Sequence, residues 1–189
     1  MDLAEKATAV SRLLTALDEE IAAMQQWSGM HCKWGCGKCC FKPDIEATAL
    51  EFLPFAFHLY QSGQAGTWLQ SLEENDSSIC LILNPQQNGA GLCSQYPHRG
   101  MICRLFGFSA RVNKHEIKEL ITCQTIKTEQ AEAFANADSQ IKSGKEVPVM
   151  HQYYMRLSTI DFELTRDFYP INEAIAQAIK LVMHYYAYR

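Results

Sequence analysis

Four of the eight cysteines in this chain of 189 residues lie in one short stretch, which reads His-Cys-Lys-Trp-Gly-Cys-Gly-Lys-Cys-Cys-Phe. The cysteines follow a C-x3-C-x2-C-C spacing and are Cys32, Cys36, Cys39 and Cys40. Gly35 and Gly37 flank the second of them, and glycine takes positive φ without steric cost, so the loop can curl its sulfur atoms toward one point. Adjacent cysteines do not easily form a disulfide with each other. The spacing therefore indicates a loop that binds a metal ion or an iron–sulfur cluster.

The remaining four cysteines follow within the next stretch of the chain, at Cys80, Cys93, Cys103 and Cys123. The segments before and after contain none, whereas chance placement would scatter some into them. Free cysteine is also a common small core residue, and Cys80, within an apolar run, is the weakest ligand candidate for that reason. We interpret all eight cysteines as candidate metal ligands.

Composition and charge exclude several classes of function. The net charge is −4 and no basic run is present, so nothing indicates a nucleic acid or an anionic membrane as partner. Charged residues interrupt the N-terminal segment, which therefore does not read as a signal peptide, and no apolar run has the length of a membrane span. We expect a cytoplasmic protein, where thiols stay reduced and bind metal rather than form disulfides.

Apolar periodicity predicts helices at both ends of the chain. Residues 2–28 repeat apolar side chains at steps of three and four, with Asp2 as the N-cap and Gly29 in the stop signal. Further helices are predicted at 127–143, 150–168 and 170–189. The apolar faces of such helices are typical of core packing or of a surface for a protein partner.

The centre of the chain is predicted to be irregular. We expect a helix from Asp44 to about Tyr60 that Pro54 kinks or divides, a short helix at 67–72 and a buried strand at 79–83. Two further strands, at 108–112 and 116–120, are expected to form a hairpin. The prediction is one α+β domain over 1–189, in which terminal helices enclose a small metal-organised centre at about 30–125.

The cysteine array resembles the YkgJ-type cysteine-cluster family, which is described as zinc- or iron-chelating. That family joins a C-x3-C-x2-C-C element to a later C-x-x-Y-x-x-R-P-x-x-C-R-x-F element. The residues that match the second element are Cys93, Tyr96, Arg99, Cys103, Arg104 and Phe106. Gly100 stands where the family usually has proline, and Leu81 follows Cys80 where proline is common. The resemblance implies metal binding by the cysteines but specifies no reaction, and the sequence indicates no catalytic residue.

The identity of the metal stays open at the level of the sequence. Iron–sulfur clusters are held by cysteines at short, irregular spacings, and we favour a [4Fe–4S] cluster with a redox, sensing or enzymatic role. The alternative is a protein that acts as an interaction scaffold and is stabilised by one or two structural zinc ions. Only Cys36 and Cys39, however, have the C-x2-C spacing usual for zinc. A second alternative is an S-adenosylmethionine-dependent enzyme, because C-x3-C-x2-C matches that class. Two observations oppose this alternative. Cys40 would be a fourth ligand to the cluster and would occupy the iron that such enzymes leave open for the cosubstrate. The sequence also lacks the alternating strands and helices of the β/α barrel that these enzymes need.

Basic and aromatic residues beside the cysteines are candidates for contacts around the metal. Thiolate ligands leave a net negative charge, which nearby cations and N–H donors offset. Arg104, directly after Cys103, is the first candidate, Arg99 is the next, and Tyr96 could donate to a sulfur atom or pack over the site. His31 and His98 lie near cysteines in the sequence, but with eight thiols present we expect neither to be a ligand.

Overall fold

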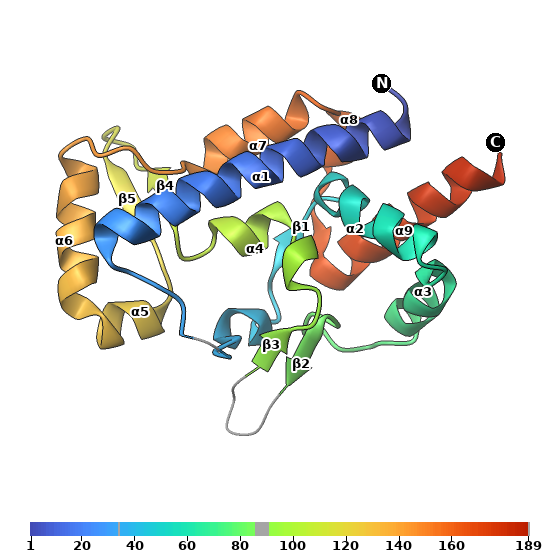
Figure 1. Ribbon diagram of the computed structural model, residues 1–189, viewed down its shortest axis with the longest axis horizontal. Helices are drawn as coiled ribbons and strands as arrows, with labels where there is room; N and C mark the ends of the chain where they lie inside the picture. The colour runs from blue at the N-terminus through green and yellow to red at the C-terminus, as the bar shows by residue number, and fades with distance from the viewer. Residues whose placement is uncertain (34, 86–90, 189) are drawn as a thin grey trace.

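A computed structural model describes residues 1–33, 35–85 and 91–188 and has the predicted α+β architecture, with helices at both ends (Figure 1). The principal helices are α1 (Leu3–Ser28), α2 (Leu53–Gln61), α3 (Ala65–Glu73), α4 (Met101–Leu105), α5 (Gln124–Glu129), α6 (Ala131–Lys142), α7 (Met150–Ser158), α8 (Glu163–Arg166) and α9 (Ile171–Ala187). Short 3-10 helices are η1 (Lys38–Phe41), η2 (Leu50–Phe52) and η4 (Tyr96–His98). None of the described helices combines the length and apolarity needed to span a membrane.

Helix α1 has the bounds that its caps predict. The Glu5 amide donates to Asp2 Oδ1 at 2.9 Å, and the Asp2 amide donates to Glu5 Oε2 at 2.8 Å, which is a capping box. Gly29 ends the helix at φ 72°, a conformation that favours glycine. The predicted apolar face is buried, and its buried residues are Ala7, Val10, Leu13, Leu14, Leu17, Ile21 and Met24.

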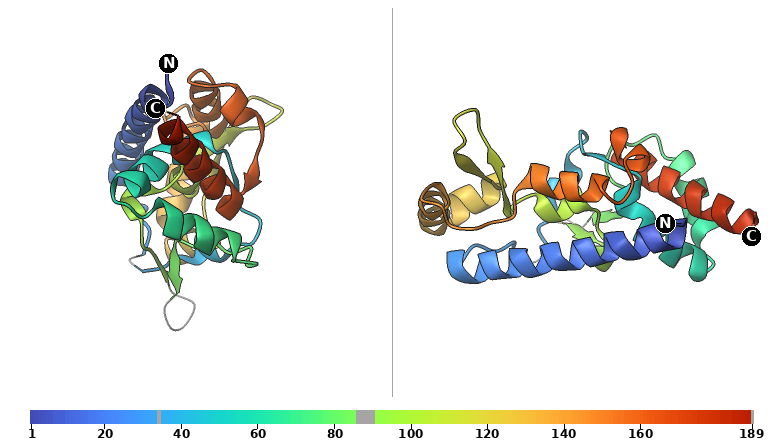
Figure 2. Two further views of the ribbon diagram at one scale, coloured as in Figure 1. Left: turned by 90° about the vertical axis from the view of Figure 1, so that its right-hand side faces the viewer. Right: turned by 90° about the horizontal axis from the view of Figure 1, so that it is seen from above.

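The core is a single cluster of buried apolar side chains that draws on both ends of the chain. Helices α1, α2 and α9 supply much of it, with Leu17, Phe55 and Ile175 at most 1% exposed. Figure 2 shows α1 along one side of the molecule and α7 beside it. The residues of η1, which carries Cys39 and Cys40, are not buried. The apolar core therefore lies apart from the first cysteine loop.

Three two-stranded antiparallel sheets occur in the described part of the chain. Strand β1 (Glu46–Ala47) pairs with β6 (Tyr169–Pro170), and β2 (Leu83–Pro85) pairs with β3 (Gly91–Cys93). Strands β4 (Ser109–Val112) and β5 (Lys118–Ile121) form the hairpin that the sequence predicts. The first sheet ties the segment after the cysteine loop to the start of the last helix.

Two predicted elements in the centre are wrong. The helix expected from Asp44 begins only at Leu53, and Pro54 lies in its first turn, where a missing N–H costs nothing. The strand expected at 79–83 begins only at Leu83, the first residue of β2, and the residues before it form a turn in which the Leu83 amide donates to the Cys80 carbonyl at 3.0 Å. A short apolar run has the same sequence pattern whether it forms a buried strand or a turn anchored in the core, so the sequence does not distinguish the two structures.

Two predicted helices are interrupted. The segment expected as one helix at 127–143 begins at Gln124 and breaks at Gln130, whose φ and ψ are −128° and 41°. The segment expected at 150–168 divides into α7 and α8. At the first break, the Gln130 side chain binds the backbone of His31, 99 residues away, and so gains partners that the amphipathic pattern cannot reveal.

Candidate metal centre

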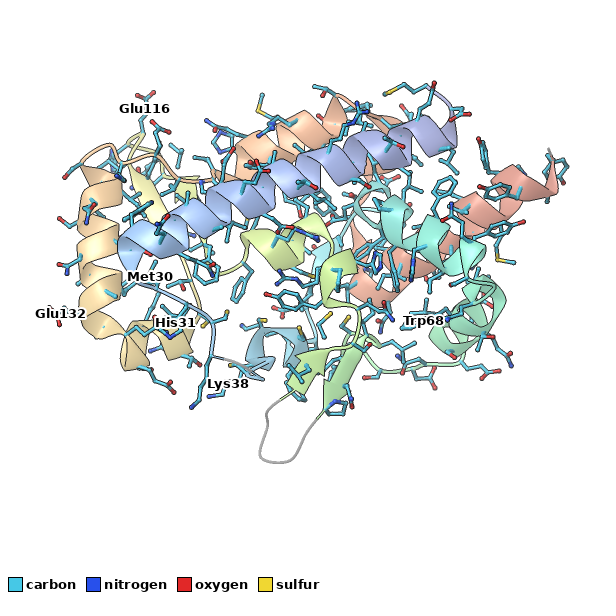
Figure 3. The ribbon with its side chains drawn as sticks, viewed as in Figure 1. Met30, His31, Lys38, Trp68, Glu116 and Glu132 are labelled. Atoms are coloured by element: carbon cyan, nitrogen blue, oxygen red, sulfur yellow. The ribbon has the colours of Figure 1, made fainter. Side chains whose placement is uncertain are left out.

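All eight cysteines are free thiols. They come from the loop before β1, the turn before β2, strand β3, helix α4 and the start of α5, so no single element contains the site. Figure 3 places His31 near α5 and Lys38 at η1, with sulfur atoms around η1 and beside the segment between β3 and α4. The fold thus gathers thiols that lie up to 91 positions apart, from Cys32 to Cys123.

The first cysteine loop is fixed against strand β3. Gly37 precedes η1 at φ 52°, and a Cβ atom on it would overlap the backbone of Gly91. The Gly91 amide donates to the Gly35 carbonyl at 3.0 Å. In this loop the sulfur atoms of Cys39 and Cys40 lie 3.9 Å apart. Gly37 must therefore be glycine for the backbone of the cysteine loop to approach the backbone of Gly91 this closely, beside the Cys39–Cys40 pair.

Cys80 and Cys93 are brought together by the second small sheet and by the last helix. Leu83 pairs with Cys93, and Cys80 lies in the turn that leads into β2. The Asn172 side chain holds this turn, because its Oδ1 accepts from the Leu81 amide at 2.9 Å and its Nδ2 donates to the Ile79 carbonyl at 2.9 Å. Helix α9 therefore positions a cysteine more than 90 residues earlier in the chain.

Cys103 lies on α4, whose first turn is held by a buried carboxylate. Glu51 is 1% exposed; its Oε2 accepts from the Ile102 amide at 2.9 Å. Its Oε1 accepts from the Thr48 amide at 2.9 Å and from the Thr48 hydroxyl at 3.2 Å. Burial raises the pKa of Glu51, although these donors oppose the shift. Glu51 thus fixes the helix that carries Cys103.

Cys32 and Cys123 are joined through Gln130. The His31 amide donates to Gln130 Oε1 at 3.0 Å, and Gln130 Nε2 donates to the His31 carbonyl at 2.7 Å. This pair of bonds holds the residue before Cys32 at the junction of α5 and α6. Cys123 is the N-cap of α5, where its sulfur accepts from the Ile126 amide at 3.4 Å. The start of the cysteine loop is therefore fixed to the element that Cys123 begins.

Burial and neighbouring thiols both shift the pKa values of the cysteines. Loss of solvent raises the pKa of Cys32 to about 11, with contributions from Cys39, Cys123 and Cys36. Burial likewise raises the pKa of Cys80 to about 11, and Cys93 adds to the effect. These are values for thiols without metal, so uptake of a metal must release protons.

Three further thiols have raised pKa values and one has a lowered value. Burial, with Cys80 and Cys93 nearby, raises the pKa of Cys103, and burial also raises that of Cys93. The hydrogen bond between the vicinal thiols lowers the pKa of Cys39 to about 6 and raises that of Cys40. Arg99 also favours the Cys39 thiolate. Cys39 is therefore the thiol that ionises most readily among those with a shifted pKa.

Arg104 is buried beside the thiols, being 6% exposed. Its Nε contacts Asp18 Oδ1 at 3.0 Å, and its Nη2 donates to the Pro97 carbonyl at 2.9 Å. Its Nη1 is buried and has no partner among the described residues. The positive charge of Arg104 opposes the rise that burial causes in the pKa of Cys93. A buried N–H without a partner carries a free-energy cost unless a further acceptor satisfies it.

Tyr154, on α7, provides a second buried donor of this kind. Its hydroxyl has no partner among the described residues. Burial raises its pKa, and Glu51 and Cys103 raise it further, so the hydroxyl lies near both. No sequence pattern connects this tyrosine with the cysteines, because α7 follows Cys123 by more than 25 residues.

The other two residues predicted to surround the metal have different positions. The Arg99 guanidinium lies 3.6 Å from the centroid of the Tyr96 ring, and its Nε donates to the Tyr96 carbonyl at 3.3 Å. Tyr96 is 57% exposed. Arg99 lies near several thiols, since it opposes the rise in the pKa of Cys32 and of Cys103. Tyr96 therefore orients Arg99 through its ring and carbonyl.

Two histidines near the cysteines have partners of their own. His31 Nδ1 lies 3.2 Å from the Gly29 carbonyl. The His98 ring stacks on His58, with centroids 4.2 Å apart, and on Phe55. Burial lowers the pKa of His98, and His58 and Arg104 add to the shift. Both imidazoles thus have local contacts that account for their positions.

The donor set fits a thiophilic metal or an iron–sulfur cluster. Sulfur is the donor common to all the gathered ligands, and thiolates select zinc, copper(I) and iron–sulfur clusters. Two buried donors without partners, on Arg104 and Tyr154, lie where a negatively charged centre would accept from them. Within the described residues, no three His, Cys, Asp or Glu side chains converge closely enough to hold one ion. Metal binding therefore requires the thiols to draw together.

Sequence reasoning missed four residues that position the cysteines or face them: Glu51, Gln130, Tyr154 and Asn172. A signal existed for one of them, because Thr48-Ala49-Leu50-Glu51 has the S/T-x-x-E pattern of a capping box. The hydrogen bond that the Thr48 amide donates to the Glu51 carboxylate is one half of that motif. The other three act on segments far away in the sequence, and a local pattern does not reveal such contacts.

The departure from the family pattern at Gly100 has a steric cause. Gly100 has φ −65° and ψ 172°, a conformation open to other residues. A Cβ atom there would lie 2.6 Å from Phe52 Cζ and 2.8 Å from Glu51 Oε2. Both neighbours are buried. Glycine therefore lets the chain pass close to Phe52 and Glu51 immediately before α4.

We expect Gly100→Ala to lower the free energy of unfolding by about 1–3 kcal/mol, because the added methyl group overpacks a buried contact. Urea denaturation measures this change. Gly66→Ala is the matched control: it lies in α3 with no atom within 4 Å of the added Cβ, so it should be neutral or stabilising. Equal stability of Gly100→Ala and the unaltered protein would contradict the steric explanation.

Comparison with known proteins agrees with this cysteine centre. A family model named CxxCxxCC, described as "Putative zinc- or iron-chelating domain", matches residues 31–139, which is more than half of the chain. The chain therefore belongs to this cysteine-cluster family, and the resemblance predicted from the two motifs is confirmed. No curated protein and no solved structure was found to match the chain. The matched region includes all eight cysteines and Gln130 but neither Tyr154 nor Asn172.

Proposed function

We propose that this protein binds a [4Fe–4S] cluster through Cys40, Cys80, Cys93 and Cys103 and has a redox or sensing role. Asn172 holds the turn that contains Cys80, Glu51 holds the helix that carries Cys103, and Cys93 pairs with Leu83 directly after that turn. Cys103 and Cys80 both contribute to the raised pKa of Cys40. Four protein thiolates per cluster is the usual ligand number. Membership of a zinc- or iron-chelating family supports metal binding as such.

The observation that carries the proposal is the pair of buried donors beside this group. Arg104 Nη1 and the Tyr154 hydroxyl have no partner among the described residues, and they lie near Cys93 and Cys103 respectively. A cluster with four thiolates is negatively charged and has sulfur atoms that accept hydrogen bonds. Such bonds would satisfy both donors and tune the reduction potential.

Zinc is the second candidate, and one distance favours it. Four sulfur ligands at about 2.3 Å from a tetrahedral zinc ion lie about 3.8 Å from one another. The Cys39 and Cys40 sulfur atoms are 3.9 Å apart, which is close to that separation. In this case the metal would stabilise the fold and the protein would have no redox activity.

Anaerobic purification followed by absorption spectroscopy and by assays for iron, labile sulfide and zinc distinguishes the candidates. We expect brown protein with equal amounts of iron and sulfide, about four of each per chain. Colourless protein with stoichiometric zinc would exclude the cluster and support the second candidate. Equilibrium dialysis with S-adenosylmethionine on the loaded protein tests cosubstrate binding, which a cluster with four thiolate ligands should not show.

Tyr154→Phe tests the hydrogen bond from α7 to the cluster. The change removes a hydroxyl that has no protein partner among the described residues, so the fold should be unaffected. We expect a lower midpoint potential, since a hydrogen bond to sulfur stabilises the more negative, reduced cluster. Tyr153→Phe, on the same helix but with Glu20 as neighbour, is the control and should leave the potential unchanged. Equal potentials for both variants would show that Tyr154 does not contact the cluster.

A further inference from the structure

An ion pair joins the long N-terminal helix to the helix that carries Cys103. Arg104 Nε lies 3.0 Å from Asp18 Oδ1 and 3.2 Å from Asp18 Oδ2. The two residues are 86 positions apart in the sequence and meet because α4 lies against α1 (Figure 1). Asp18 borders the buried face of α1, one helical turn after Leu14 and one before Ile21. Its carboxylate can therefore reach a residue that packs against that face.

The two members of this ion pair differ in their access to solvent. The side chain of Arg104 is 5% exposed, whereas that of Asp18 is 47% exposed. A cation that is removed from water needs nearby acceptors and negative charge to stabilise it. Within the described part of the chain, Arg104 has two acceptor partners, Asp18 and the Pro97 carbonyl, and only Asp18 is charged. The negative charge that faces this buried cation therefore comes from the surface of α1.

These two contacts also fix the orientation of the guanidinium group. Asp18 holds Nε, and the Pro97 carbonyl accepts from Nη2 at 2.9 Å. Because the guanidinium is planar, two bonds to different elements determine where its third nitrogen lies. That nitrogen, Nη1, is buried and has no partner among the described residues. Asp18 and Pro97 thus hold the position of the atom that would donate to the proposed cluster.

We propose that Asp18 is a positioning residue of the metal centre, which acts through Arg104 and tunes the reduction potential from the surface of α1. Asp18 holds the guanidinium in place and offsets part of its positive charge. This inference rests on the proposed function, which places a negatively charged cluster beside Arg104. A nearby cation favours the more negative, reduced state of a cluster, and the pair with Asp18 limits that effect. Removal of the Asp18 charge should therefore favour reduction.

Asp18→Asn is the direct test of this role. Asparagine keeps an oxygen that can accept from Arg104 Nε, but it removes the negative charge. We expect a higher midpoint potential in a spectroelectrochemical titration, with unchanged iron and sulfide content. Glu19→Gln is the matched control, because Glu19 is the next exposed residue of α1 and forms no ion pair with Arg104 in the described part of the chain. An unchanged or lower potential in Asp18→Asn, or an equal rise in the control, would overturn the proposal.

A double-mutant cycle tests whether Asp18 acts through Arg104. In an Arg104→Gln background the guanidinium charge is absent, so Asp18→Asn should cause no further change in the midpoint potential. A shift of equal size in both backgrounds would show that Asp18 acts on the cluster directly and would refute the positioning role.

Nitrogen-15 NMR of the metal-free protein tests the positioning without any cluster and without the Arg104→Gln variant. The Arg104 Nε–H, held by Asp18, should give a resolved and slowly exchanging resonance, which Arg104→Lys identifies by its loss. Asp18→Ala should abolish that resonance, and Glu19→Gln should retain it. A resonance that persists in Asp18→Ala would refute the positioning role. Purified protein with zinc and no iron would refute the cluster and the effect on potential, whereas the resonance would still decide whether Asp18 positions Arg104.

Discussion

Removal of metal under reducing conditions is expected to accelerate amide hydrogen exchange in residues 31–33, 35–45, 77–85 and 91–99 by about tenfold or more, and to lower the melting temperature by several degrees. The residues of η1 are not buried, so apolar contacts contribute little to holding the first cysteine loop. Metal ligation fixes such segments directly, because the binding free energy becomes folding free energy. The effect should therefore be large where the ligands lie.

The helical core should retain its protection in this experiment. Leu17 of α1 and Ile175 of α9 are fully buried in the apolar cluster, to which none of the described residues of the first cysteine loop belongs. Exchange measured by mass spectrometry on chelated and metal-loaded protein separates the two regions. The triple variant Cys80→Ser, Cys93→Ser, Cys103→Ser is the control, since chelation should hardly change its exchange in residues 77–85 and 91–99 further. An unchanged melt, or acceleration spread evenly over α1, would contradict the coupling of metal binding to local folding.

Glu51→Gln is expected to destabilise the protein by about 1–3 kcal/mol, because an amide nitrogen would then face an N–H donor at one of two buried positions. The carboxylate accepts from Thr48 through one oxygen and from Ile102 through the other, and glutamine can supply only one acceptor oxygen. The shift of α4 should also weaken metal binding by about 10–100-fold, as supporting residues of metal ligands typically do. Urea denaturation and metal competition measure the two effects.

The pH dependence of this variant follows from the raised pKa of Glu51. A carboxyl group whose pKa is raised on folding stabilises the folded state fully below its unfolded value of 4.5, and the contribution is lost as pH rises through the folded pKa. The penalty of Glu51→Gln in metal-free protein should thus be largest below pH 4.5 and shrink at higher pH. Glu46→Gln, at an exposed position of β1, is the control and should change stability by less than about 0.5 kcal/mol. A penalty that grows with pH would show that Glu51 does not titrate as a buried acid.

The sequence by itself determined the family, the terminal helices and the β4–β5 hairpin. These features depend on local information: the cysteine spacing, the periodicity of α1 with its Asp2 and Gly29 caps, and paired extended segments around a turn. The predicted ligands, cofactor and single-domain organisation remain predictions, as do the cytoplasmic location and a partner for the terminal helices. Local patterns also misled where they were short, as at 79–83, because five apolar residues fit a strand and a core-anchored turn equally well.

Only the tertiary structure decided which residues support the cysteine-bearing segments. Gln130 binds the backbone 99 residues away, and Asn172 binds that of Leu81 91 residues away. Glu51 reaches Ile102, 51 positions later. Each of these bonds is made by a polar side chain whose partner becomes adjacent only after the helices pack, so no periodicity or spacing encodes it. The cysteine spacing specifies the zinc- or iron-chelating family, whereas the packing of α5, α9 and η2 specifies which cysteine-bearing segments are held in place and by which residues.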